Sequence, residues 1–193
     1  MLRARAGRLA LVLAILPIGT GAAMFLFSAI GNEFHASADV VSAVLGLGGG
    51  VAIVLGCIAG GRLADRVAKP TAYALSCGLG LVACVVIALS PRSSEGYAVS
   101  TLFYTFTLGM VSASFTGLVL AIIGDTAAAT KINLFFALNT LFSLGMLRAI
   151  GWVHDRWSTN AMLCTEALVG VAALVAFVLL AGRVRGTSLP EGD

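Results

Sequence analysis

Composition indicates a membrane environment for this chain of 193 residues. Hydrophobic residues make up 59% of it and charged residues only 11%, whereas a soluble globular domain carries about 25% charged residues. The net charge of +3 is small, and the basic residues lie in short clusters rather than on one face, so nucleic acid is not expected as a partner. We therefore predict an all-α membrane protein surrounded by a lipid bilayer.

Six apolar stretches are each long enough to cross the hydrocarbon core of a bilayer, which takes about 20 residues of α-helix. The predicted spans are 9–31, 40–61, 71–90, 97–124, 132–153 and 161–182, joined by short connections. In the first span Pro17, Gly19 and Gly21 indicate a bend or close packing. Residues 1–193 are expected to form one six-helix transmembrane domain.

The second span is rich in glycine and ends in the most charged short segment of the chain. Its pairs Gly46/Gly50 and Gly56/Gly60 have the four-residue spacing that lets another helix approach closely. Segment 60–70 then interrupts the apolar pattern, and we predict a tight turn there with one buried carboxylate, that of Asp65.

Basic residues are distributed unevenly between the two sides of the predicted bundle. If the N-terminus lies inside, the external loops hold only Arg92 and Arg156. The cytoplasmic segments hold Arg3, Arg5, Arg8, Arg62, Arg66, Lys69, Lys131, Arg183 and Arg185. This bias is typical of multi-pass proteins, and it predicts that both termini are cytoplasmic, in a cell membrane such as the bacterial inner membrane.

A short motif occurs twice, which suggests an internal repeat. Gly61-Arg-Leu-Ala-Asp65-Arg66 ends the second span, and Gly151-Trp-Val-His-Asp155-Arg156 ends the fifth. The units would cover about 9–90 and 97–182. Because each unit holds three helices, the second would be inverted relative to the first, an arrangement found in transporters.

The fourth span carries a polar stripe. Thr101, Thr105, Gly109, Ser112 and Thr116 follow one another at spacings of three or four residues, so they share one side of a helix. Such a side faces either a polar cavity, with Tyr104 at its edge, or a neighbouring helix with which it exchanges hydrogen bonds.

Arg148 and Glu166 are the ionisable residues inside the predicted spans. Both are expected roughly 6–10 Å from the outer boundary, by the rise of an α-helix, which makes an ion pair between successive helices plausible. The pair could be structural or could couple protons, and Arg148 alone could extend to the interface. Asn139, in the fifth span, is a second polar candidate for a solute path.

Metal, cofactor and enzyme chemistry have little support in the sequence. The four cysteines lie in apolar runs without a Cys-x-x-Cys or Cys/His spacing that would bind zinc. The chain also lacks Gly-x-Ser-x-Gly, His-Glu-x-x-His and paired intramembrane carboxylates. We therefore expect no metal, no cofactor and no enzymatic activity.

Segment Gly61-x-Leu63-Ala64-Asp65-Arg66 resembles the loop signature of the major facilitator superfamily of transporters, although Ala68 and Pro70 depart from the pattern. Further similarity is to the C-terminal six helices of its peptidoglycan-fragment and acetyl-CoA permease-like branch. It lies in Leu16-Pro-Ile-Gly-Thr-Gly-Ala-Ala23, Gly56-Cys-Ile-Ala-Gly-Gly61, Ala129-Thr-Lys131 and Met162-Leu-Cys-Thr-Glu-Ala167.

The resemblance implies one six-helix half of a twelve-helix secondary transporter for a small solute. A second half, or a second copy in a homodimer, would complete it. It implies that Asp65 caps a neighbouring helix, pairs with an arginine and stabilises one transport state. It also implies a solute path lined by the first and fourth spans, which would add Thr20, Met24 and Ser28. The alternative is a non-transporting membrane subunit or a truncated transporter remnant.

Overall fold

The structure, a computed structural model, describes residues 21–123 and 128–185, with side chains described for 21–121 and 129–180. Every regular element in this part of the chain is helical. The elements are η1 (Ala22–Leu26), α2 (Phe27–Ile30), η2 (Gly31–Phe34), α3 (Ala38–Ala43), η3 (Val44–Gly48), α4 (Gly49–Arg66), α5 (Lys69–Leu89), α6 (Ser94–Ile123), α7 (Ala128–Arg156) and α8 (Thr159–Arg185).

Five helical segments are long and apolar enough to cross a membrane: Ala38–Arg66, Lys69–Leu89, Ser94–Ala121, Ala129–Arg156 and Thr159–Leu180. These correspond to the second to sixth predicted spans, so the all-α prediction is confirmed and a multi-pass membrane protein is supported. The first predicted span is described only from residue 21, where a shorter apolar helix, Ala22–Phe34, begins. Residues 9–20 of that span lie outside the described residues.

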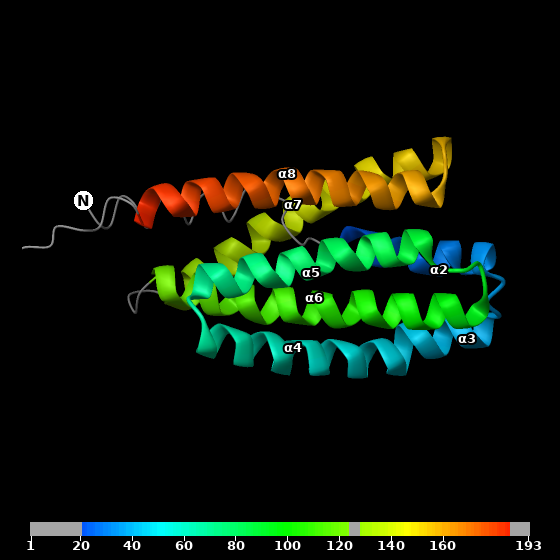
Figure 1. The fold of residues 1–193 in the computed structure, drawn as a ribbon, viewed down its shortest axis with the longest axis horizontal. Coiled ribbons are helices and arrows are strands. Elements are labelled where there is room, and N and C mark those ends of the chain that lie inside the picture. Colours follow the sequence, from blue (N-terminus) through cyan, green and yellow to red (C-terminus); the bar gives the residue numbers. More distant parts are fainter. Residues whose placement is uncertain (1–20, 124–127, 186–193) are drawn as a thin grey trace, which may run out of the picture.

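The long helices form a layered bundle (Figure 1). Helix α6 packs between α4 and α5, α5 packs between α6 and α8, and α7 crosses obliquely against α8 and η1. Of the five candidate spans α6 is the most buried and α7 the least. The repeated motif ends α4 at Arg66 and α7 at Arg156, at opposite ends of the bundle in Figure 1, while the inverted repeat itself stays a prediction.

The predicted turn at 60–70 is wrong in extent and in its buried carboxylate. Helix α4 continues to Arg66, and α5 begins at Lys69, with a proline in its first turn, where the missing N–H is no loss. The Asp65 side chain is 80% exposed and lies 3.5 Å from Lys69 Nζ. The same Lys69 amine donates a hydrogen bond to the Ala64 carbonyl oxygen at 2.9 Å, which satisfies one free carbonyl at the end of α4.

The role implied for Asp65 by the family resemblance is not seen in this conformation. The N-cap of α5 is Ala68, without a side-chain hydrogen bond, and the cation beside Asp65 is Lys69 rather than an arginine. Of the other motif residues, Gly61 and Leu63 are half-buried and Arg66 is exposed. The motif thus forms the last turns of a helix rather than a loop.

Asp65→Asn is expected to change the free energy of unfolding by less than about 1 kcal/mol, because an exposed ion pair contributes little. Equilibrium unfolding in mixed detergent micelles, compared with the wild type, measures the difference. A loss of several kcal/mol would contradict the exposed pairing and would require a buried partner for this carboxylate.

Helices α4 and α6 cross at glycines. A Cβ atom added to Gly56 would lie 2.0 Å from the Phe106 carbonyl oxygen, and one added to Gly109 would lie 2.3 Å from the Ile53 carbonyl oxygen. A Cβ on Gly60 would lie 2.5 Å from the Met110 carbonyl oxygen. The predicted close approach at Gly56/Gly60 is therefore confirmed, with backbone against backbone.

The other predicted glycine pair does not pack against the described part of the chain. A Cβ on Gly46 or Gly50 would meet nothing within 4 Å. Both line a shallow apolar groove on the outside of η3 and α4, together with exposed Leu47 and Val54. The four-residue spacing alone did not distinguish this outer surface from the inner one.

Candidate functional site: a buried carboxylate among four helices

Glu166 is a carboxylate in the interior of an apolar bundle. It lies on α8, seven residues after Thr159, which is about 10 Å from the helix start at 1.5 Å per residue. The residue is only 7% exposed. A carboxylate at this depth in a membrane span is expensive unless its oxygens are hydrogen-bonded, so its partners decide what it can do.

Three donors from three different elements converge on this carboxylate. The Ala23 backbone N–H donates to Oε1 at 3.2 Å, and the Tyr104 hydroxyl donates to the same oxygen at 3.0 Å. The Cys84 thiol donates to Oε2 at 3.8 Å. Glu166 on α8 is thereby linked to η1, α6 and α5, and we call Glu166, Tyr104, Cys84 and Ala23 the Glu166 cluster.

The Ala23 N–H is available because a helix begins beside it. Gly21, the N-cap of η1, has a φ of 65°, a left-handed conformation that glycine adopts readily. The first N–H groups of the helical segment Ala22–Phe34 therefore lack partners within their own helix. A carboxylate at such a terminus is favoured by the hydrogen bond and by the helix dipole. Of the bend or close packing predicted in this span, close packing is seen at Gly21, where an added Cβ atom would lie 2.5 Å from the Leu108 side chain, while Pro17 and Gly19 lie outside the described residues.

A small cavity adjoins the cluster. It lies between α5, α6 and α8, and its lining includes Glu166, Tyr104, Cys84, Cys77 and Thr107. Its volume is about 40 Å³, counted as the space open to the centre of a water-sized sphere. Because one water needs roughly 10–15 Å³ by this measure, the cavity can hold a few waters or a small ion but no organic solute in this conformation.

Aromatic packing fixes the position of the Tyr104 hydroxyl. The Tyr104 ring meets the Phe27 ring edge to face, with 4.9 Å between centroids. Nearer the start of α6, the Tyr97 hydroxyl donates to the Phe27 carbonyl oxygen at 3.0 Å. These contacts hold α2 against α6, and so hold the start of η1 against Glu166.

The predicted Arg148–Glu166 ion pair is wrong for this conformation. Among the described residues Glu166 bonds the three donors of its cluster, and Arg148 is an exposed side chain on α7. The two residues have similar depths but point in different directions around their helices. Extension of the Arg148 side chain to the membrane interface stays a prediction.

The polar stripe of α6 faces a helix more than a cavity. Thr101 and Thr105 are buried, and the Thr105 methyl would be 3.8 Å from a Cβ on Gly49. The hydroxyls of Thr105, Ser112 and Thr116 donate to carbonyl oxygens four residues earlier on α6. Ser112 is exposed and Thr116 half-buried. Thr105 and Gly109 therefore pack against α4, but these three hydroxyl hydrogen bonds stay within α6 and do not reach a neighbouring helix, as the alternative interpretation had it.

The other predicted path residues are not gathered at the cluster. Thr20 lies outside the described residues. Met24 is half-buried and Ser28 exposed on the first described helix, and Asn139 is half-buried on α7. Of the predicted path residues that the structure describes, only Tyr104 lines the cavity beside Glu166.

Sequence reasoning missed Cys84 and Thr107 as members of the site. Its place in an apolar run predicts that Cys84 is a packing residue, and it is buried, but its thiol also donates a hydrogen bond to Glu166. The sequence does contain one indication that Cys84 and Tyr104 are neighbours. The two residues lie at similar distances along the chain from the 91–96 connection, so they have similar depths on adjacent helices. Within the described residues no group of three or more His, Cys, Asp or Glu side chains is arranged to hold a metal ion.

Comparison of this chain with protein-family models, with curated proteins and with solved structures finds no match.

Proposed function

We propose that this chain is one six-helix half of a secondary transporter for a small solute, and that Glu166 is the group that carries its coupling proton. The observation behind the proposal is the Glu166 cluster, a buried carboxylate at a helix N-terminus beside a water-sized cavity. Intramembrane carboxylates of this kind mark proton or ion pathways, and helix termini at membrane depth are used by transporters to bind charged groups.

The chemistry of the cluster favours a proton over a metal cation. Its neighbours present an N–H, an O–H and an S–H group to the carboxylate. A sodium ion would need several oxygen acceptors directed at it, as hard cations do. A proton needs one carboxylate oxygen and a route to water, and the adjoining cavity supplies space for the water.

The family resemblance and the surface of α7 support the need for a second half. Asn133, Thr140 and Arg148 are exposed and lie on one side of α7 at spacings of seven and eight residues. Polar and charged groups within a span rarely face lipid. A second six-helix half, or a second copy of this chain, would cover that side.

Glu166→Gln is expected to abolish proton-coupled uptake while leaving the fold intact, because the amide oxygen still accepts the Ala23 and Tyr104 hydrogen bonds but does not exchange a proton. Purified protein is reconstituted in vesicles holding a pH-sensitive dye, and amino acids, dipeptides, amino sugars and hexoses are added separately. Solute-dependent lumen acidification by the wild type should fall at least about tenfold in the variant, the scale of losing a proton-transfer group.

Glu95→Gln is the matched control, because Glu95 is an exposed carboxylate at the start of α6. This variant should acidify the lumen as the wild type does. Equal rates in the wild type, in Glu166→Gln and in protein-free vesicles would favour the alternative, a non-transporting membrane subunit. Solute uptake that is unchanged in Glu166→Gln would leave transport standing and remove the proton role of Glu166.

A further inference from the structure

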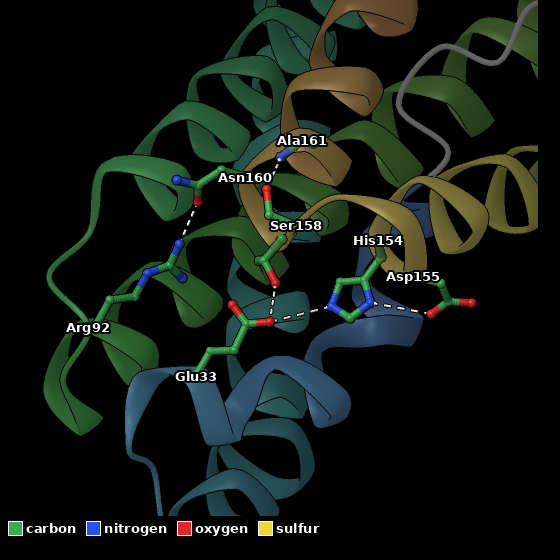
Figure 2. Close-up of polar contacts among 8 residues, drawn as sticks. Glu33, Arg92, His154, Asp155, Ser158, Asn160 and Ala161 are labelled. Carbon is green, nitrogen blue, oxygen red and sulfur yellow. Dashed lines mark hydrogen bonds and ion pairs between the residues drawn. The ribbon is translucent and has the colours of Figure 1, made fainter.

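The corner between α7 and α8 lies at the end of the bundle opposite the α4–α5 turn (Figure 1), and polar contacts with other connections hold it there (Figure 2). The Thr159 hydroxyl donates a hydrogen bond to Glu33 Oε1 of η2 at 2.5 Å. The Arg92 guanidinium, from the connection between α5 and α6, donates a hydrogen bond to Asn160 Oδ1. It also lies over the Phe34 ring, 4.4 Å from the centroid. The corner is thus tied to two other connections, so side chains that project from it have a fixed position.

Both tryptophans of the chain lie at this corner. Trp152 is in the last turns of α7, and Trp157 directly follows that helix. They are 52% and 64% exposed, and their rings meet edge to face with 5.3 Å between centroids. In the part of the chain that the structure describes, neither indole N–H has a protein acceptor. A large apolar ring with a free donor suits surroundings that are apolar on one side and wet on the other.

A cation lies against this tryptophan pair. The Arg156 guanidinium is 5.1 Å from the centroid of the Trp152 ring, and among the described residues it has no ion pair. A guanidinium with free N–H groups binds phosphate well. Because Asp155 beside it carries the opposite charge and is also exposed, the corner matches the phosphate group that every phospholipid carries rather than a strongly anionic surface.

The exposed surface changes from polar to apolar at the tryptophans. The exposed residues of the corner itself include Asp155, Ser158 and Asn160. Further along the two helices the exposed side chains include Leu141 and Leu144 on α7 and Leu168 on α8. Arg148, about one turn before Trp152, is an exposed cation close to this boundary. Such a change marks the level at which a span leaves the hydrocarbon core, and tryptophan is enriched at that level in membrane proteins.

We propose that Trp152 and Trp157 form an anchor that binds the headgroup layer of a phospholipid bilayer. The indole rings lie between the acyl chains and the phosphate groups, and their N–H groups donate to lipid oxygens. The anchor fixes the depth of the corner, and with it the depth of Glu166, about 10 Å along α8 from the helix start. It does not require the chain to be a transporter.

Tryptophan fluorescence tests the anchor in the full chain, because the sequence holds two tryptophans and both lie at the corner. The protein is reconstituted in phosphatidylcholine vesicles whose acyl chains carry bromine either near the headgroup or near the terminal methyl group. Quenching by the shallow bromines should be at least about twofold stronger than quenching by the deep ones, since aromatic belts lie at headgroup level. Trp152→Phe and Trp157→Phe, which each leave one tryptophan, should show the same order.

Leu141→Trp, in a chain that also carries Trp152→Phe and Trp157→Phe, is the matched control. Leu141 is exposed and lies on nearly the same side of α7 as Trp152, about 16 Å from it along the helix axis. Its tryptophan should be quenched more strongly by the deep bromines.

Two results would overturn the anchor. One is wild-type quenching that is equal at both depths or stronger from the deep bromines. The other is wild-type fluorescence that no brominated lipid quenches, because water or a protein partner would then surround the corner in place of lipid.

Discussion

Gly56→Leu is expected to prevent α4 and α6 from assembling, with a loss of at least about 3 kcal/mol in the free energy of unfolding. Even the first added carbon would lie 2.0 Å from the Phe106 carbonyl oxygen and 3.1 Å from the Gly109 Cα atom. These are backbone atoms of a buried helix, which cannot turn aside as a flexible side chain would. Overpacking of a core costs typically 1–3 kcal/mol, and a clash between backbones lies at or above the top of that range.

The measurement is equilibrium unfolding in mixed detergent micelles, together with the yield of monodisperse protein. Gly50→Leu is the matched control, because Gly50 lies on the same helix and a Cβ there meets nothing within 4 Å. The control should unfold like the wild type or slightly later, since leucine is a better helix former than glycine. Equal losses in the two variants would contradict the α4–α6 contact.

Glu166→Leu is expected to lose about 2–4 kcal/mol of stability, in contrast to Glu166→Gln. Leucine offers no acceptor, so the Ala23 N–H and the Tyr104 hydroxyl would be left without partners, at about 1–3 kcal/mol each. Removing the burial penalty of the carboxylate itself offsets part of this loss. We expect the unfolding midpoint in mixed micelles to fall clearly for Glu166→Leu and little for Glu166→Gln.

Adding Tyr104→Phe to Glu166→Leu separates the contribution of the Tyr104–Glu166 hydrogen bond from the other effects of Glu166→Leu on stability. Because phenylalanine keeps the ring against Phe27 and removes the stranded hydroxyl, the double variant should recover part of the loss. Strictly additive losses would mean that the Tyr104–Glu166 hydrogen bond at 3.0 Å contributes nothing to the fold.

Depth along a helix could be predicted from the sequence, but direction around the helix could not. The helical rise placed Glu166 inside α8 correctly. It also placed Arg148 at a similar depth, and the two were paired for that reason. In the structure Glu166 faces η1, α5 and α6, whereas Arg148 faces outward on α7. Rotation depends on which helices pack together, and a single sequence does not contain that directly.

The same limitation explains the glycine and threonine patterns. The spacing of Gly46/Gly50 equals that of Gly56/Gly60, yet only the second pair meets another described backbone. The stripe through Thr101 and Thr105 does lie on one side of α6, but Gly49 of α4 lies opposite it. A periodic pattern identifies a shared face, and the neighbour on that face decides whether it binds solute or packs.

The charged residues of segment 60–70 predicted the end of a helix at the wrong position. Segment 60–70 was predicted as a turn because charges interrupt an apolar run. Its residues nevertheless stay helical up to Arg66, the last residue of α4. The Lys69 amine then donates a hydrogen bond to the Ala64 carbonyl oxygen near the end of that helix. The charges mark where the helix leaves the apolar environment rather than where its hydrogen bonding stops.

The glycine contacts between α4 and α6 restrict how this protein can change shape. Two helices that meet backbone to backbone at Gly56, Gly60 and Gly109 have no side chains at these three points that could be repacked as they slide. They are expected to move as one rigid body. Helix α7 is the least buried of the candidate spans, so a hinge-like displacement is expected at α7, with the α4–α6 pair as the fixed frame.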